Sequence, residues 1–289
     1  EDYENNIIRK HEKTRPVKEN DRTKLTDTLS ANTGPVFLTY KDEAAIDAFV
    51  SDWTAKNEPT IDFTDNVGVQ HTVWRVAETD AAPILGGFGN VPLSYVADGH
   101  HRSASAARVG KERRDANPDH DGTENYNWFL AVLFPASQLK ILSYNRVVRD
   151  LNGLSADGFL KNLTENFLLD SDGCKVPENP ESLCIYVDGK WHTIRWDIED
   201  SASVIEKLDV SVLQDRLLAP VLGIGDPRTD DRIDLEKRVD SGEWAVAFSM
   251  YPTTVKQLID IADAGEIMPP KSTWFEPKLR SGLFVYTLD

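Results

Sequence analysis

A short apolar run followed at once by an amphipathic helix pattern is the feature that most constrains the fold of this chain. Residues 36–40, "VFLTY", are apolar, aromatic and β-branched, as strands are. In the next segment Ile46, Phe49 and Val50 recur with the i, i+3, i+4 spacing of a helix that has one apolar face. A strand joined directly to such a helix predicts a mixed α/β fold.

Further strand and helix patterns follow along the chain. The runs 70–77 and 127–134 have strand composition, and the second is apolar enough to predict a central strand that is buried on both faces. Ser155 precedes an amphipathic pattern and is the expected N-cap of a helix. Asp188 and Gly189 separate two strand-like runs, and the pair predicts a two-residue hairpin turn, because both residues tolerate positive φ.

The last part of the chain adds a buried strand pattern and another helix. Residues 244–250, "WAVAFSM", predict the strand, and the helix is expected to have Thr253 as its N-cap and Gly265 just past its end. With the helix at Ser155 opening a new segment, the sequence predicts two domains. We place them at residues 1–150 and at residues 151–289.

Composition excludes several function classes. The 32 Lys and Arg against 48 Asp and Glu give a net charge of −16, which argues against a surface that grips DNA or RNA. No apolar run approaches the roughly 20 residues of a membrane span. Cys174 and Cys184 lack CxxC spacing, which favours buried or idle thiols in a reducing compartment, and hence a cytoplasmic protein. The chain opens without Met, so we expect a fragment or an absent first segment.

Residues 95–114, "YVADGHHRSASAARVGKERR", carry the strongest candidate site. Asp98 is the expected cap of a helix that starts near His100, and Gly99 permits the tight turn before it. The unpaired N–H groups of a helix start attract anions, and Arg102 adds a cationic fork that suits phosphate or carboxylate. The motif therefore predicts a phosphate-binding turn.

The paired histidines of this motif allow other interpretations. The helix dipole favours neutral imidazoles, so His100 or His101 can donate to a phosphate oxygen or move a proton near neutral pH. In the simplest alternative, Asp98 is only a cap and the imidazoles are solvated. A metal site is disfavoured, because neighbours on a helix project roughly 100° apart and seldom share one ion.

A basic run precedes this motif. Residues 9–24 hold seven Lys or Arg against three acidic residues, within a chain that is acidic as a whole. Arg15 and Lys18 are candidates to surround a phosphate, and Glu12 is a candidate general base or metal-binding carboxylate. The alternative is an exposed, ion-paired segment, as mixed charge runs commonly are.

The C-terminal segment 268–283, "MPPKSTWFEPKLRSGL", is dense in hydrogen-bond donors around Trp274 and Phe275. Its donors form a candidate clamp over a ligand: Lys271, Ser272, Thr273, Lys278 and Arg280. The tandem prolines hold this backbone extended. The alternative is a strap that packs the two aromatic residues into the core.

These stretches together resemble a known family. "IRKHEKTRP", "YVADGHHRSASAARV", "GIGDPRTD" and "MPPKSTWFEPKLRSGL" are similar to the signatures of the bacterial and archaeal family catalogued as domain of unknown function 1015, also labelled SerK-like. The turn Gly99–Arg102 is similar to the phosphate-binding turn of the ParB/sulfiredoxin superfamily. The resemblance implies a ParB/sulfiredoxin-like core in residues 1–150 and a C-terminal α+β extension in residues 151–289.

The resemblance also implies a function. It favours a phosphate- or nucleotide-binding protein of the small-molecule, amino-acid-like kinase type, which uses a nucleotide (ATP or CTP) and Mg²⁺. Glu12 is then the candidate base, and His101 or Asp98 positions the metal or the transferring group, with Gly99, His100 and Arg102 on the phosphates. The alternatives are a regulatory module that senses a nucleotide or phosphorylated metabolite without chemistry, and metal-dependent hydrolysis through the histidines. The phosphate acceptor and the oligomeric state stay open.

Overall fold

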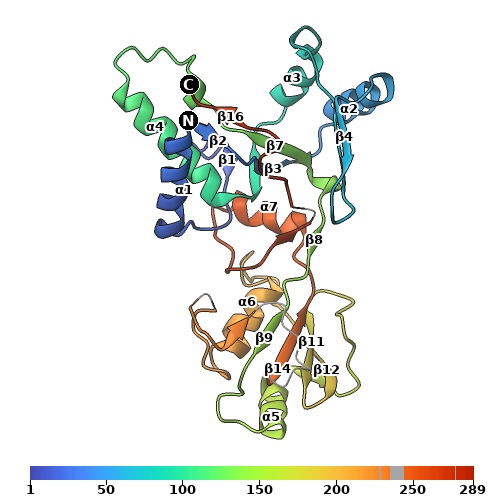
Figure 1. The fold of residues 1–289 in the computed structure, drawn as a ribbon. Coiled ribbons are helices and arrows are strands. Elements are labelled where there is room, and N and C mark those ends of the chain that lie inside the picture. Colours follow the sequence, from blue (N-terminus) through green and yellow to red (C-terminus); the bar gives the residue numbers. More distant parts are fainter. Residues whose placement is uncertain (228, 235–243, 277) are drawn as a thin grey trace. The chain divides into compact units, whose positions relative to one another are not determined.

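The computed structural model describes residues 1–227, 229–234, 244–276 and 278–289 (Figure 1). The chain divides into two compact units, Glu1–Leu139 with Pro277–Asp289, and Lys140–Glu276. The boundary expected after residue 150 therefore moves to residue 139, and the C-terminal residues return to the first unit. They return because strand β16 (Tyr286–Thr287) pairs with β2 (Ala31–Asn32), a long-range pairing that local sequence patterns do not reveal.

The first unit contains the candidate turn and the helices α1 and α4 beside it. Its elements, in chain order, are β1 (Ile8–Arg9), α1 (Pro16–Leu29), β2 (Ala31–Asn32), β3 (Val36–Tyr40), α2 (Ala44–Lys56), β4 (Ile61–Thr64), β5 (Gln70–Val73), α3 (Ala82–Gly89), β6 (Ser94–Asp98), α4 (His100–Ala116), β7 (Ala131–Pro135) and β16 (Tyr286–Thr287). The predicted strand at 36–40 and the helix that follows it are confirmed as β3 and α2.

Four strands of this unit form one sheet in the order β1-β6-β3-β7. The pairings β1–β6 and β3–β7 are parallel, and β3–β6 is antiparallel. The apolar residues Val36, Leu38 and Val96 pack together at its centre. The sheet thus fixes the end of β6, where α4 begins.

The strand predicted at 127–134 lies differently from the expectation. Strand β7 pairs with β3 at an edge of the four-stranded sheet and is mostly half-buried rather than buried on both faces. Trp128 lies before the strand and is 63% exposed, and Leu133 within it is 38% exposed. The prediction of a central strand was wrong, because apolar composition does not specify which edge of a strand finds a partner.

The second unit is built around a larger antiparallel sheet. Its elements are β8 (Ile141–Leu142), β9 (Arg146–Val148), α5 (Ala156–Asn166), β10 (Leu168–Asp170), β11 (Ser182–Val187), β12 (Lys190–Arg195), α6 (Asp209–Leu213), a π-helical turn (Gln214–Leu218), β13 (Ile233–Asp234), β14 (Val246–Met250), α7 (Val255–Asp263) and β15 (Trp274–Phe275). Six of the strands pair in the order β10-β12-β11-β14-β9-β13. The mixed α/β architecture is thereby confirmed in both units.

Local signals in this unit are mostly confirmed. The Ser155 hydroxyl accepts a hydrogen bond from the Gly158 N–H and caps α5. Asp188 and Gly189 join β11 to β12 with φ of 48° and 76°. Both features depend on neighbouring residues alone, which is why the sequence predicted them.

The predicted cap of α7 was off by one residue. Thr254, not Thr253, caps the helix, since its hydroxyl accepts from the Gln257 N–H while the Gln257 side chain accepts from the Thr254 N–H. The Thr253 hydroxyl instead donates to the Ser272 carbonyl. By sequence alone, the two adjacent threonines are equivalent candidates for the cap. The contact with Ser272 engages Thr253, and Thr254 caps the helix.

The C-terminal aromatic pair belongs to the second unit. β15 pairs antiparallel with β8, and Phe275 is buried. Among the described residues, the helices fall short of the combined length and apolar character that crossing a bilayer requires.

Candidate phosphate-binding site

The candidate turn lies where β6 ends and α4 begins, in the first unit. Gly99 is the N-cap residue and has a φ of 96°, a left-handed conformation that favours glycine. A Cβ at this position would lie 3.0 Å from Nε and 3.1 Å from Nη2 of Arg102. The Arg102 guanidinium is therefore folded back onto the backbone of the turn, and a side chain at residue 99 would displace it.

Asp98 does not cap α4, contrary to the prediction. Its Oδ1 accepts a hydrogen bond of 2.8 Å from the N–H of Gly99, and its Oδ2 lies 3.3 Å from Nζ of Lys278. As the N-cap residue, Gly99 has no side chain that could cap the first turn of α4. Because Gly99 takes the N-cap position, Asp98 is one residue too early to reach the N–H groups of that turn. They are left as candidate donors to an anion.

His100 occupies the buried side of this turn. The ring is 6% exposed, and its Nδ1 lies 4.0 Å from Oε2 of Glu12. The His11 ring packs edge-on against it, with ring centroids 4.5 Å apart. Burial lowers the pKa of His100 to about 4, against the opposing effect of Asp98. His100 is thus a neutral imidazole at physiological pH, close to a carboxylate.

His101 faces the basic run. Its Nε2 accepts a 3.0 Å hydrogen bond from the backbone N–H of Arg15, so its own proton resides on Nδ1. Partial burial lowers the pKa of His101, and the charges of Lys18 and Arg15 lower it further, while Glu19 opposes them. His101 is therefore also neutral, and it joins the turn to the start of α1.

The basic run forms the beginning of α1. Arg15 is the N-cap residue of α1 and has an extended backbone, and Pro16 follows it as the first helical residue. Lys18 and Arg22 lie one and two turns into the helix, and both act electrostatically on His101. The structure thus brings the basic run and the turn to one place, while the Glu12 carboxylate, 46% exposed, lies beside His100.

The comparisons with known proteins assign the chain to a family. A family model described as "Protein of unknown function (DUF1015)" matches residues 1–211. The chain belongs to the DUF1015 family. Among curated proteins, no sequence matches it.

Solved structures are similar to the DUF1015 chain at low sequence identity. SbnI with a C-terminal truncation, from Staphylococcus aureus, is 12% identical with a TM-score of 0.51, over 97% of this chain and 84% of that one. A free serine kinase in complex with AMP is 12% identical with a TM-score of 0.45, over 93% and 83%. A conserved hypothetical protein from Pyrococcus furiosus is 11% identical with a TM-score of 0.41, over 95% and 90%. At these identities the likeness concerns the fold alone.

The expected clamp of this DUF1015 chain is divided between the two units. In the first unit, Lys278 reaches Asp98, and Arg280 pairs with Asp65 at 2.9 Å. In the second unit, Lys271 donates to the Tyr144 hydroxyl at 2.9 Å.

Ser272 and Thr273 are the remaining members of the expected clamp, and both lie in the second unit. The buried Ser272 hydroxyl donates to the Pro269 carbonyl at 2.6 Å, which closes the turn of its own segment. Thr273 lies directly before β15. Of the clamp residues, Lys278 contacts the turn at Gly99, through the Asp98 carboxylate.

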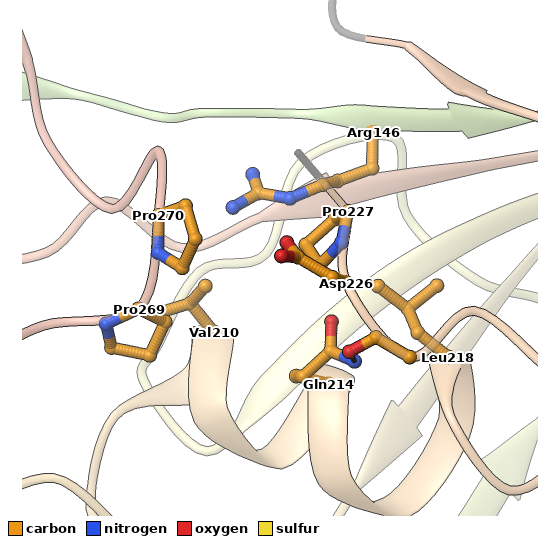
Figure 2. A pocket seen from close by; sticks show the side chains of 9 residues that line it. Arg146, Val210, Gln214, Leu218, Asp226, Pro227, Pro269 and Pro270 are labelled. Carbon is orange, nitrogen blue, oxygen red and sulfur yellow. Dashed lines mark hydrogen bonds between the residues drawn. The ribbon is translucent and has the colours of Figure 1, made fainter. Parts of the chain in front are cut away.

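A cavity with two charged side chains on its wall, which sequence reasoning missed, lies within the second unit. It measures about 220 Å³, and Figure 2 shows the guanidinium of Arg146 and the carboxylate of Asp226 on its wall, with Gln214, Pro269 and Pro270. Arg146 is 3% exposed and donates to the carbonyls of Tyr144 and Lys271. The sequence signals were an arginine inside a strand-like run and the acidic loop that contains Asp226, which could hold Mg²⁺ or be an ordinary surface loop.

Burial explains the electrostatics of this cavity. Desolvation lowers the pKa of Arg146 to about 10, which leaves the guanidinium charged at physiological pH. The guanidinium donates hydrogen bonds to two backbone carbonyls, those of Tyr144 and Lys271. Arg146 thereby fixes the Pro269–Lys271 segment to the strand β9 that carries it.

Proposed function

We propose that this DUF1015 chain is a phosphate- or nucleotide-binding protein that acts as a small-molecule phosphotransferase, with its site at the start of α4. The hydrogen bond from Arg15 to His101 carries the proposal, because it joins the basic run to the turn. Without that convergence the two motifs would be separate surface features. A small phosphorylated molecule or a nucleotide, rather than nucleic acid, fits a local cationic site on a chain with a net charge of −16.

Phosphate binding is supported by the donors that surround the turn. The N-cap residue of α4 is a glycine, which offers no side chain to the first turn, and Arg102 lies against the Gly99 backbone. Arg15 and Lys18 lie at the start of the neighbouring helix α1, and their side chains supply positive charge near His101. Phosphoryl transfer depends mainly on positioning and on charge stabilisation, which such a set of donors provides.

Glu12 is the proposed general base for the acceptor hydroxyl. Its carboxylate is half-exposed and can reach a substrate, and it lies 4.0 Å from the Nδ1 of His100. The neutral, buried His100 imidazole can hold a proton on Nδ1 toward this carboxylate and so orient it. In this assignment Glu12 takes the proton of the acceptor, and His100 is a positioning residue.

Mg²⁺ fits this site only in company with the nucleotide phosphates. Among the described residues, no three His, Cys, Asp or Glu side chains are grouped to hold a metal ion. Mg²⁺ commonly keeps several waters and binds one or two carboxylates together with substrate phosphates. With Glu12 assigned as the base, Asp98 is the carboxylate that would hold it here, and it would supply charge neutralisation to the transferring phosphoryl group.

The test uses the full chain and the variants Glu12→Gln and Glu58→Gln. Binding of ATP and CTP is measured by calorimetry, and nucleoside diphosphate release is followed with Mg²⁺ and a panel of amino acids and other small alcohols. We expect Glu12→Gln to keep nucleotide affinity while its turnover falls about 100-fold or more. Glu58, an exposed residue between α2 and β4, is the matched control, and its substitution should change neither quantity.

The two main alternatives give different results in the same experiment. Nucleotide binding without turnover of any acceptor in the panel would exclude a kinase and favour a sensing module that uses the same turn. If neither ATP, CTP nor inorganic phosphate binds, both the kinase and the sensing module are excluded. A Glu12→Gln variant with full turnover would leave phosphotransfer in place and overturn only the assignment of the base.

A further inference from the structure

The two cysteines of the chain, 10 residues apart in sequence, meet on one face of the sheet in the second unit. Cys184 lies on β11 and is fully buried, opposite Thr193 of β12. Its neighbours Leu183 and Ile185 belong to the large apolar core. Because successive residues of a strand point to opposite faces, Cys184 lies on the face away from that core.

The loop after β10 brings Cys174 onto this face. The N–H of Gly173 donates to the Trp191 carbonyl at 3.2 Å, and the N–H of Cys174 donates to the Thr193 hydroxyl at 3.1 Å. The sulfur of Cys174 then lies 2.7 Å from the sulfur of Cys184. Main-chain hydrogen bonds to β12, and not the sulfur contact alone, therefore hold the two thiols together.

Gly173 makes this close approach possible. A Cβ on Gly173 would lie 2.1 Å from the carbonyl carbon of His192 and 2.4 Å from the nitrogen of Thr193. Both of these atoms belong to the backbone of β12, which cannot rotate aside as a side chain can. A larger residue would lift the loop and separate the two sulfurs.

We propose that Cys174 and Cys184 are a reversible dithiol–disulfide pair, oxidised by hydrogen peroxide and reduced again by a dithiol. Both cysteines are free in this structure. The sulfurs of a disulfide are about 2.05 Å apart, so bond formation requires the two sulfur atoms to move closer by well under an ångström. The pair is independent of the proposed nucleotide site. In a reducing compartment, disulfides are typically transient and redox-sensing, which fits a bond that opens again.

The surroundings divide the roles between the two thiols. Cys174 is half-buried and lines a cavity of about 410 Å³, through which a molecule as small as peroxide can reach it, whereas Cys184 is buried. Burial acts to raise the pKa of the Cys174 thiol, but hydrogen bonds with Cys184 and Thr193 outweigh it and lower the pKa. Burial raises the pKa of Cys184 to about 12. Cys174 is therefore the nucleophile and Cys184 the resolving thiol.

The oxidation proceeds in two balanced steps. The Cys174 thiolate attacks one peroxide oxygen, so that an S–O bond forms, the O–O bond breaks and hydroxide leaves and takes up the thiol proton as water. The Cys184 sulfur then attacks the sulfur of the Cys174 sulfenic acid, the S–S bond forms and the S–O bond breaks. The hydroxyl leaves with the Cys184 proton as a second water. A dithiol reductant returns both thiols by exchange.

The test treats the full, reduced chain with a few equivalents of hydrogen peroxide near neutral pH, followed by denaturation, alkylation and mass spectrometry. We expect loss of the mass of two hydrogen atoms, a cross-linked peptide pair that contains Cys174 and Cys184, and full reversal with dithiothreitol. In Cys184→Ser, dimedone should trap a sulfenic acid on Cys174. In Cys174→Ser, no dimedone adduct should form.

Gly173→Ala tests the positioning of the loop. We expect it to oxidise on Cys174 without forming the internal disulfide, while Gly189→Ala, at the hairpin turn of the same sheet, keeps disulfide formation. Circular dichroism and thermal unfolding establish that each variant is folded. Unreacted thiols in the wild type, sulfinic acid without a disulfide, or a disulfide between two chains would each overturn the proposal.

Discussion

The backbone N–H of Arg15 donates a 3.0 Å hydrogen bond to Nε2 of His101, across 86 residues of sequence. Arg15 begins α1, and His101 lies in the first turn of α4. One bond therefore sets the tautomer of His101 and fixes the basic helix start beside the turn. The candidate site depends on this relationship more than on either motif alone.

Removing the imidazole of His101 should weaken this connection. We expect His101→Ala to lose about 0.5–1.5 kcal/mol of unfolding free energy, because one hydrogen bond disappears. Nucleotide affinity should also fall, since Arg15 is no longer held beside the turn. His120→Ala is the control, because His120 also makes side-chain contacts, with Tyr126 and Glu124, but lies beyond the end of α4. Chemical denaturation and calorimetry measure both quantities, and equal affinities in the two variants would contradict the prediction.

A pair of glycines with the same φ separates backbone strain from displacement of Arg102. Gly99 and Gly122 both have a φ of 96°, but a Cβ on Gly122 would meet nothing within 4 Å. Gly→Ala at either position should cost about 1–2 kcal/mol of unfolding free energy. Only Gly99→Ala should also lower affinity for nucleotide or phosphate, because its methyl group contacts the Arg102 guanidinium. Unchanged affinity in Gly99→Ala would argue against a phosphate at this turn.

The stability of the second unit should depend on pH through Asp209. Burial raises the pKa of this carboxyl to about 7, although the Glu181 N–H that it accepts at 3.0 Å acts in the opposite direction. Between about pH 4 and 7 the unfolded chain has lost a proton that the folded chain keeps, so unfolding free energy falls as pH rises. Asp209→Asn lacks this titration, so between about pH 4 and 7 its unfolding free energy should rise relative to that of the wild type by on the order of 3 kcal/mol. Urea denaturation over pH 4–8 measures the unfolding free energy of both proteins. The same pH dependence in wild type and Asp209→Asn would refute the prediction.

Arg146→Lys should destabilise the second unit despite keeping the charge. A lysine ammonium lacks the planar fork that reaches the Tyr144 and Lys271 carbonyls together, so one buried carbonyl loses its donor. We expect a loss of about 1–3 kcal/mol of unfolding free energy. Arg195→Lys is the matched control on β12, where the side chain is 55% exposed, and it should change stability by less than about 0.5 kcal/mol. Equal losses in thermal or chemical unfolding would contradict this role of Arg146.

Features that depend on near neighbours were predictable from the sequence. The strand at 36–40, the Ser155 cap and the Asp188–Gly189 turn each follow from propensities within a few residues. The Gly99 turn was recognised for the same reason, because only glycine occupies its backbone conformation without strain. The cap of α4 was wrong by one position, since Gly99 rather than Asp98 took the N-cap.

The other errors share a cause, which is contact between segments far apart in the sequence. Whether 127–134 forms a central or an edge strand depends on which strands exist to pair with it, and β7 found only β3 within the described sheet. The boundary lies at 139 rather than 150 because β8 and β9 pair with β15 and β14 of the second unit, and the C-terminal residues join the first unit because β16 pairs with β2. Buried Arg146 was missed, since nothing near it in sequence shows that its partners are the carbonyls of Tyr144 and Lys271.

The sequence by itself determined the alternation of strands and helices, the Gly99 turn and the presence of a basic run and two cysteines. Tertiary structure decided which of these meet. It brought Arg15 into contact with His101 and the Glu12 carboxylate near His100. It also brought the sulfurs of Cys174 and Cys184 into contact. Backbone conformation is fixed by neighbours within a few residues, whereas a site is assembled by sheet pairing and helix packing between segments far apart in the chain.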